Sequence, residues 1–569
     1  MREVVMTKTV AIGIQNFEKL IRENYFYIDK TMFIKEWWER GDNTTLITRP
    51  RRFGKTLNMS MVERFFSMDY ADKGDVFEGL YIWEDEKYRR LQGTYPVISL
   101  SFARIKDSNY KSTIDKICEI IQNLYSKYSY VRECDALSIS DKAFFDRIVT
   151  SCYSESDMTS SLYQLSRFLN LYHKKNVIIL LDEYDTPMHE SYVNGYWDEL
   201  VSFTRSLFNS TFKTNPYLER ALMTGIIRVS KESIFSDLNH LKVITTTSNE
   251  YATSFGFTER EVFDAVDMFG YTEKKGDVKN WYDGFVFGKH KDIYNPWSIL
   301  NFLDTGEITT YWANTSANGL VTKLLREGNR NLKEQFERLM AGDVLHTTID
   351  EQIVYNQLNG SEKAIWSLLL ASGYLKVLSV GQRADMYDVR EPKYELALTN
   401  MEVRVMFNNM VRSWFRDSGA DYNDFIKALL LDDIDAMNEY MYRVVRDIFS
   451  YFDAGKRTSD EEPERFYHGF VLGLLVELQG EYIITSNRES GFGRYDVMIE
   501  PKDKSKDAII LEFKVLNHRR ENSLEETVTA ALKQIEDKQY AALLETRGIA
   551  KDHIRKYGIA FQGKKVLIG

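Results

Sequence analysis

The chain has 569 residues, which is more than one hydrophobic core usually organises, so we expect two to four domains. Hydrophobic residues make up 44% of the chain and it contains only 8 prolines, a composition that excludes a largely disordered protein. The net charge of −10 argues against a general, charge-driven nucleic-acid binder, but it leaves room for a local basic groove.

Cysteine usage and hydropathy bear on the compartment. Cys118, Cys134 and Cys152 lie apart and lack the spacing of a zinc site, a pattern typical of a reducing compartment. The first residues contain no apolar run long enough for a secretory signal, and the most apolar segments, such as Val177–Leu181, have only the length of strands. The sequence therefore predicts a cytoplasmic protein without a membrane segment.

In chain order, residues 1–250 alternate short apolar segments with long helical patterns. Strands are predicted at Thr44–Thr48, Val97–Phe102, Val177–Leu181 and Ala221–Ile227, and helices at Leu57–Phe66, Lys111–Lys127 and Met158–Leu171. Strands that alternate with helices favour an α/β domain, in which a parallel sheet is covered on both faces.

The pattern changes after residue 250. Residues 251–455 are rich in helical patterns interrupted by aromatic clusters, and we expect them to form a lid or linker module. The polar stretch Asp453–Pro463 marks the next boundary. Residues 456–569 then predict a second compact α/β domain, with helices over Glu464–Gln479 and Leu524–Leu544 and closing strands near Gly558–Phe561 and Lys565–Ile568.

The segment after the first strand has the order strand, loop and helix that a phosphate-binding loop requires. Backbone N–H groups of such a loop and of the helix N-terminus face the bound anion. We expect nucleotide contacts from Arg51, Arg52, Phe53, Gly54, Lys55, Thr56 and Leu57. Lys55 would reach the β- and γ-phosphates of ATP, and Thr56 would bind Mg²⁺. Arg49 stands where such loops usually have their first glycine, so this loop must be shaped differently.

A lone Gly-Lys-Thr is a weak signal, and a second motif strengthens it. The apolar strand at 177–181 ends in Asp182, which would orient Mg²⁺, and Glu183, which would activate the attacking water. The alternative is a buried strand that ends in a solvated acidic turn. At the end of the next strand, Thr224 and Arg228 are placed to sense the γ-phosphate, and a plain core-edge role stays equally open.

A second group of polar residues lies near the C-terminus. Asp496 precedes one strand-like segment, and Glu512 and Lys514 lie two apart on the next, so these two share a face. Two carboxylates form an oxygen-rich site suited to Mg²⁺ or Mn²⁺, and a lysine beside it can activate water next to a phosphodiester. Glu464 would add a third carboxylate, with Glu477 as the competing choice. The alternative is a hairpin whose charges are simply solvated.

Several strings resemble a known family. They are Gly13-Ile14 with Tyr27–Thr31, RPRRFGKT at 49–56, LLDEYD at 180–185, TGIIRVSKESIFSDLN at 224–239 and WYDGF at 281–285. They resemble the bacterial AAA-ATPase-like family that is usually fused to a PD-(D/E)XK nuclease domain, and the arginine at 49 is shared with that family's loop. The C-terminal strings ERFYHGFVLGLL, GRYD, LEFK and YGIAF are similar to the nuclease partner. The resemblance is thin between residues 320 and 450.

The resemblance implies a P-loop AAA-like domain, a helix-rich module and a restriction-endonuclease-like domain. It matches Asp496, Glu512 and Lys514 to the nuclease motif, and Glu464 less directly. The leading hypothesis is an ATP-dependent, Mg²⁺-requiring nuclease that acts on nucleic acid, with DNA preferred over RNA. The alternative is a regulatory NTPase whose nuclease-like domain only binds nucleic acid or a partner. In a homo-oligomer, Arg205, Arg220 or Arg228 would be candidates to complete a neighbour's site.

Overall fold

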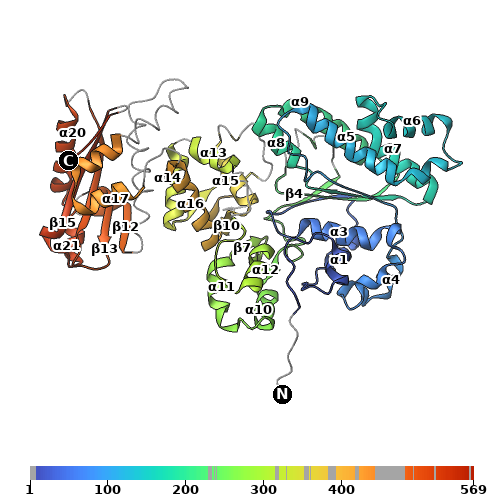
Figure 1. The fold of residues 1–569 in the computed structure, drawn as a ribbon, viewed down its shortest axis with the longest axis horizontal. Coiled ribbons are helices and arrows are strands. Elements are labelled where there is room, and N and C mark those ends of the chain that lie inside the picture. The colour runs from blue at the N-terminus through green and yellow to red at the C-terminus, as the bar shows by residue number, and fades with distance from the viewer. Residues whose placement is uncertain are drawn as a thin grey trace, which may run out of the picture. The chain divides into compact units, whose positions relative to one another are not determined.

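The protein is described by a computed structural model (Figure 1). The described residues are 8–228, 234–235, 238, 240–313, 319–327, 330–350, 358, 361–381, 392–416, 422–442, 478, 481–490, 493–517, 521–562 and 565–569. The chain divides into two compact units, residues 1–328 with 341–404, and residues 329–340 with 405–569. Each unit is treated separately below.

The first unit is built on a five-stranded parallel sheet in the order β2-β3-β4-β1-β5, which confirms the predicted α/β class. Its strands are β1 Thr44–Thr48, β2 Val97–Ser101, β3 Val177–Asp182, β4 Leu218–Gly225 and β5 Leu241–Ile244. All five residues of β1 and all six of β3 are buried, which explains their continuous apolar and threonine-rich sequence. Because β4 lies between β1 and β3, the ends of these three strands meet at one edge.

Helices cover both faces of this sheet (Figure 1). One layer holds α1 Phe17–Arg22, α2 Met32–Arg40, α3 Lys55–Phe66 and α4 Glu86–Leu91; the other holds α5 Tyr110–Lys127, α6 Ile139–Val149, α7 Glu155–His173, α8 Thr186–Asn194 and α9 Trp197–Phe212. Side chains of α2 and α3 pack with Ile47, Ile178 and Leu180 of the sheet in one apolar core. Among the helices that the structure describes, none has both the length and the apolar character needed to cross a bilayer.

The rest of the first unit is a module that is helical, as predicted, and also contains two small antiparallel sheets that were not. The sheets are β6 Phe257–Thr258 with β8 His290–Tyr294 and β7 Phe285–Phe287, and β10 Leu375–Val380 with β11 Tyr394–Leu398 and β9 Leu345–Thr347. The helices are α10 Glu259–Met268, α11 Lys275–Tyr282, α12 Pro296–Thr305, α13 Gly319–Glu327 and α15 Glu362–Ala371. Three of these strands have two or three residues, too few for an alternating pattern to emerge.

The second unit contains a mixed sheet in the order β12-β13-β14-β15-β16, in which only β14 and β15 pair in parallel. Its elements are β12 Tyr482–Ser490, β13 Gly493–Pro501, β14 Ala508–Val515, β15 Ile554–Gln562, β16 Lys565–Ile568, α14 Arg330–Ala341, α17 Tyr422–Leu431, α20 Leu524–Asp537 and α21 Ala542–Thr546; α16 Met401–Arg416 begins in the first unit.

Two helices predicted for the C-terminal part fare differently. The helix predicted over Leu524–Leu544 is interrupted after Asp537, and the backbone of Gln539 has a positive φ of 54°. A residue in that left-handed conformation cannot continue a right-handed helix, so the chain turns and restarts at Ala542. The helix predicted over Glu464–Gln479 falls almost entirely outside the described residues.

Candidate functional sites

The loop between β1 and α3 gives the first site its shape. Gly54 caps the N-terminus of α3 with a φ of 80°, and Arg52 also has a positive φ, of 66°. A positive φ suits glycine and is uncommon for arginine, so the loop is held in this shape by its surroundings. Arg49 is not among the described residues with positive φ, which explains how arginine can replace the glycine that the motif usually has there.

The side chain of Arg49 turns away from the loop and is fully buried. Its Nη1 donates to the carbonyl oxygens of Thr48 and Thr245 at 2.9 and 2.7 Å, and its guanidinium lies 4.5 Å from the centre of the Phe287 ring. Burial lowers its pKa to about 9, so Arg49 remains a cation at neutral pH. Arg49 therefore ties β1 to the segment after β5.

Lys55 begins α3 and is only 5% exposed. Its Nζ donates to the carbonyl oxygens of Arg49 and Pro50 at 2.8 and 2.9 Å, so the ammonium group lies inside the curve of the loop. Burial lowers the pKa of Lys55, and the nearby carboxylates of Glu183, Asp185 and Asp182 counteract that shift. The position suits a lysine that neutralises phosphate charge.

Thr56, Asp182 and Thr224 form one hydrogen-bonded group where the ends of β3 and β4 meet the start of α3. Thr56 Oγ1 donates to Asp182 Oδ2 at 2.7 Å, and Thr224 Oγ1 donates to Asp182 Oδ1. Thr224 also accepts from the backbone N–H of Glu183 at 3.2 Å. Asp182 is 4% exposed, and burial raises its pKa. A carboxylate and a hydroxyl at one edge form the kind of oxygen-ligand set that Mg²⁺ prefers.

The two acidic residues that follow Asp182 differ in their surroundings. Glu183 has a φ of 52°, and its carboxylate, half-buried, accepts from Thr186 Oγ1 at 3.1 Å. Asp185 is buried and accepts from the N–H groups of Ile226 and Ile227 at 2.8 and 3.0 Å. Burial raises the pKa of Asp185 to about 6. Asp185 was not singled out from the sequence, although its motif was, because nothing in the string separates a structural from a reactive carboxylate.

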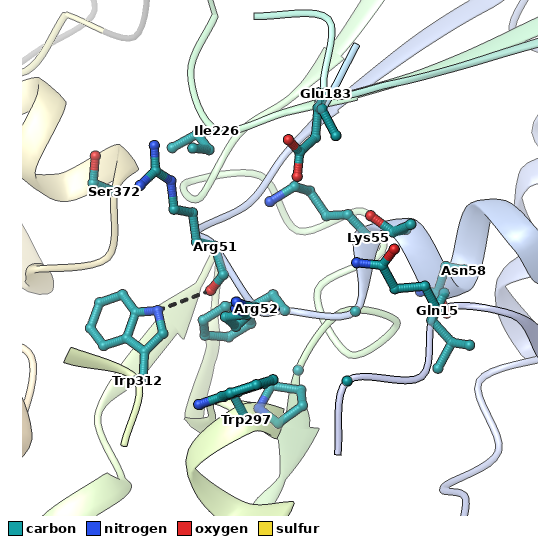
Figure 2. Close-up of a pocket in the computed structure, with 18 of the residues that line it drawn as sticks. Gln15, Arg51, Arg52, Lys55, Asn58, Glu183, Ile226, Trp297, Trp312 and Ser372 are labelled. Carbon is teal, nitrogen blue, oxygen red and sulfur yellow. Dashed lines mark hydrogen bonds between the residues drawn. The ribbon is translucent and has the colours of Figure 1, made fainter. Parts of the chain in front are cut away.

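A cavity of about 440 Å³ opens in front of the loop, within the usual size range of small-molecule sites (Figure 2). All seven loop residues predicted to touch a nucleotide line it, as does Glu183, although the Phe53 ring itself packs against Phe285 at 4.7 Å. Further lining residues that the sequence did not suggest include Gln15, Asn58 and His189, and burial lowers the pKa of His189 to about 4.

The predicted arginines are spread over the domain. Arg220 lies near the start of β4, at the opposite edge of the sheet from the loop, where its Nη1 donates to the carbonyl oxygens of Trp37 and Trp38. Arg205 lies on α9, and Arg228 is half-buried three residues beyond β4. The structure places Thr224 beside Asp182, to which it donates a hydrogen bond. It does not place Arg228 at the wall of the described cavity.

The second site lies where β13 and β14 pair in the second unit. The antiparallel register matches Val497 with Leu511, which sets Asp496 and Glu512 on one face of the sheet. Asp496 Oδ2 accepts from the backbone N–H of Phe513 at 2.8 Å. Glu512 is 2% exposed within β14, and a buried carboxylate in an apolar strand needs compensating donors or a cation.

Gln534 of α20 joins the second site from above the sheet. Its Oε1 accepts from Lys514 Nζ at 2.7 Å, and its Nε2 donates to Glu512 Oε1 and, at 3.2 Å, to the hydroxyl of Tyr540. Burial, together with the charges of Glu512 and Asp496, raises the pKa of Tyr540. Tyr540 lies in the turn after α20, although the helix predicted over Leu524–Leu544 would have included it, and Glu464 lies outside the described residues.

A further acidic group, which the sequence did not suggest, lies in the helical module. Carboxylate oxygens of Glu259, Asp283 and Asp292 lie within 4.8 Å of one another. Burial and the neighbouring Asp292 raise the pKa of Asp283 to about 7, and Lys279 forms an ion pair with Glu259. Lys279 thus offsets part of the negative charge of this cluster, and the raised pKa of Asp283 favours the neutral form of that carboxyl.

Comparisons with known proteins give separate matches for the N-terminal and C-terminal parts of the chain. Residues 11–235 match a family described as a predicted AAA-ATPase, and residues 462–569 match the PD-(D/E)XK nuclease superfamily. The chain is also 25% identical over 572 residues to the "Uncharacterized protein in vnfD 5'region" of Azotobacter chroococcum mcd 1, an alignment that covers 97% of this chain and 96% of that protein. The loop at 49–56 and strand β3 with Asp182 lie inside the first match, and Asp496, Glu512 and Lys514 lie inside the second. The chain therefore contains a region that matches the predicted AAA-ATPase family, followed by a C-terminal region that matches the PD-(D/E)XK nuclease superfamily.

Proposed function

We propose that the protein binds and hydrolyses ATP with Mg²⁺ and that its C-terminal domain is a metal-dependent nuclease. The observation that carries the proposal is the group of Thr56, Asp182 and Thr224 beside the buried Lys55, at the edge of a parallel sheet where ligands bind in such folds. We assign ATP binding to residues 1–250, a lid or linker role to residues 251–455 and phosphodiester cleavage to residues 456–569.

In the ATPase site, Thr56 and Asp182 would hold Mg²⁺, which neutralises charge on the transferred phosphoryl group. Lys55 and the backbone from Arg51 to Leu57 would bind the phosphates. Glu183 lines the cavity, and its side chain is only half-buried. It is therefore the candidate to orient the attacking water. Thr224 would sense the γ-phosphate through its bond to Asp182, and Arg228, which does not line the cavity, would join it only by moving toward bound ATP.

In the nuclease site, Asp496 and Glu512 would hold Mg²⁺ or Mn²⁺, with Glu464 as a proposed third ligand. Bound metal lowers the pKa of a coordinated water and neutralises charge on the phosphodiester. Lys514 lies on the same face, and Gln534 holds both Lys514 and Glu512, so the lysine is positioned to assist the attacking water. The substrate is nucleic acid, with DNA as the first to test.

Calorimetric titration tests the two sites separately on the full-length protein. MgATP should bind the wild type and the control Lys111→Ala, which alters an exposed lysine of α5, and should bind Lys55→Ala at least ~10-fold more weakly. Mn²⁺ should bind the wild type, and the double variant Asp496→Asn with Glu512→Gln should lose that binding.

Cleavage of DNA in Mg²⁺ or Mn²⁺ tests the nuclease assignment. Lys514→Ala should lower the rate by about 100-fold or more, within the range for removing a group that assists proton transfer. The control Lys533→Ala, an exposed lysine next to Gln534 on the same helix, should cleave like the wild type. Absence of Mn²⁺ binding at millimolar concentration, with ATP binding intact, would instead favour a regulatory NTPase whose nuclease-like domain only binds nucleic acid or a partner.

A further inference from the structure

Each of residues 49–53 of the phosphate loop contacts a residue of the helical module. Three of the contacts are made by side chains on aromatic rings: Arg49 on Phe287 at 4.5 Å, Arg52 on Trp297 at 4.2 Å, and Phe53 on Phe285 at 4.7 Å. Pro50 faces Gly373. The carbonyl oxygen of Arg51 accepts hydrogen bonds from Trp312 and Asn295. These partners come from a stretch of the chain that begins more than 200 residues after the loop.

The Arg51 carbonyl oxygen accepts two hydrogen bonds from side chains of the module. It accepts from Trp312 Nε1 at 3.1 Å, drawn as a dashed line in Figure 2, and from Asn295 Nδ2 at 3.3 Å. In a trans peptide the C=O and the following N–H point in opposite directions. A carbonyl fixed toward Trp312 therefore presents the N–H of Arg52 to the other side and keeps the oxygen lone pairs away from a bound anion.

Both donors are tied to a single buried carboxylate. Glu402 is fully buried, and its Oε1 accepts from the N–H groups of Tyr311 and Trp312 at 2.6 and 2.7 Å. Its Oε2 accepts from Ser298 Oγ at 2.8 Å, in the first turn of α12, the helix that Asn295 caps. Burying a carboxylate is costly unless donors satisfy it, and these three fix Trp312 relative to α12.

Gly373 allows the module to approach this closely. Its φ is 84°, and a Cβ placed there would lie 2.8 Å from Pro50 Cγ. Any other residue would have to adopt a strained backbone and push the proline, and so the loop, away. Both the side chains of the module and the backbone at Gly373 thus allow the module to contact the phosphate loop closely.

We propose that Trp312, held in place by Glu402, is a positioning residue for the phosphate loop, setting the Arg51 peptide so that the loop's N–H groups face a nucleotide phosphate. The inference rests on the proposed nucleotide site. It implies that the helical module, beyond covering the cavity, determines the affinity of a loop that lacks the usual first glycine.

The test separates the hydrogen bond of Trp312 from its packing. Trp312→Phe keeps an aromatic ring and removes the indole N–H; Glu402→Gln keeps an acceptor for the two backbone N–H groups, whereas Glu402→Ala removes it. Trp281→Phe, in α11, is the matched control. Two quantities are measured: the Kd for MgATP, and amide hydrogen exchange of residues 51–56 in nucleotide-free protein.

Loss of one hydrogen bond predicts a 2- to 10-fold weaker Kd and a similar acceleration of exchange in Trp312→Phe. Glu402→Ala should match or exceed that change, while Glu402→Gln and Trp281→Phe stay near the wild type. If Trp312→Phe folds poorly, Asn295→Asp replaces it: this variant keeps the cap of α12 but turns the donor facing Arg51 into an acceptor, and the same loosening is expected.

The two possible failures can be told apart. A wild-type protein that does not bind ATP contradicts the proposed function, and the exchange rates still judge the positioning role. Equal Kd values and equal exchange in the wild type, Trp312→Phe and Asn295→Asp would overturn the positioning role even if ATP binds.

Discussion

Asp182 shows how a single residue of the first site is balanced between stability and function. Both of its oxygens accept from threonine hydroxyls, yet burial still raises its pKa, so its ionised form is disfavoured in the folded protein. The hydroxyl of Thr224 accepts from the backbone N–H of Glu183 and must therefore donate to Asp182. The hydroxyl of Thr56 can rotate and accept a hydrogen bond from residue 182 instead of donating one. An asparagine at position 182 can therefore be accommodated.

We predict that Asp182→Asn is more stable than the wild type at pH 8 in EDTA and without nucleotide. A carboxyl whose folded pKa is raised contributes stability below its unfolded pKa near 4 and loses it as pH rises through the folded value. The advantage of the variant should thus shrink as pH falls toward 4. For a domain of roughly 150–250 residues, each kcal/mol of relief raises Tm by ~2–4 °C.

The same pair of proteins should respond in opposite ways to ligand. MgATP should raise the Tm of the wild type and leave Asp182→Asn nearly unchanged, because the variant lacks the proposed metal ligand. Asp115→Asn, at an exposed position on α5, serves as the control and should show neither effect. A variant that melts below the wild type at pH 8 in EDTA would refute this description of Asp182.

At the scale of elements, the second site depends on how closely α20 packs on β15. Gly558 permits that packing, since a Cβ there would lie 2.8 Å from the Val528 carbonyl oxygen and 3.0 Å from Ala531 Cβ. The contacts are to the backbone and to a short side chain, which cannot move aside, so the helix itself must shift. Because α20 carries Gln534, such a shift would reach Lys514 and Glu512.

We predict that Gly558→Ala lowers stability by about 1–3 kcal/mol, the usual cost of overpacking, and slows DNA cleavage, although Gly558 has no side chain and meets the site only through the backbone pairing of β15 with Glu512 of β14. Gly276→Ala, in α11, is the control: its added Cβ would meet nothing within 4 Å, so it should be neutral or slightly stabilising. Unfolding curves and cleavage rates measure both effects. Cleavage at the wild-type rate would show that the nuclease site does not depend on the position of α20 and its Gln534.

The strong periodic elements could be predicted from the sequence. The four strands expected in the first domain and the helix expected over Lys111–Lys127 correspond to β1–β4 and α5, within a few residues at their ends. The antiparallel sheets of the module could not, because β6 and β7 have only two and three residues and because β6 pairs with β8, a strand more than 30 residues further along the chain. The break at Gln539 also lacked a signal, since glutamine rarely adopts a positive φ.

The site residues divide in the same way. Motif spacing brought attention to Lys55, Thr56, Asp182 and Thr224, which the structure groups at one sheet edge, and to Asp496, Glu512 and Lys514. Trp312 and Glu402 could not be tied to the loop, because contacts across 261 and 90 residues leave no local pattern. Sequence spacing reports what one element presents, and only the fold reports what a distant element holds in place.

At the scale of the whole molecule, the central claim is that ATP bound in one domain governs cleavage in the other. Two chemically distinct sites in one chain motivate it: a phosphate loop with Lys55, and two carboxylates with Lys514. If nucleotide only bound as a structural ligand, it would change stability and leave cleavage unaltered. The claim therefore has a signature that neither site alone would produce.

The most direct measurement is DNA cleavage by the full-length protein in Mg²⁺, with and without ATP, for the wild type, Lys55→Ala and Lys514→Ala. We predict that ATP changes the cleavage rate of the wild type several-fold, that Lys55→Ala cleaves without responding to ATP, and that Lys514→Ala cleaves at least about 100-fold more slowly. Cleavage that persists when Glu512→Ala and Lys514→Ala are combined, or a wild-type rate that ATP leaves unchanged, would contradict the account.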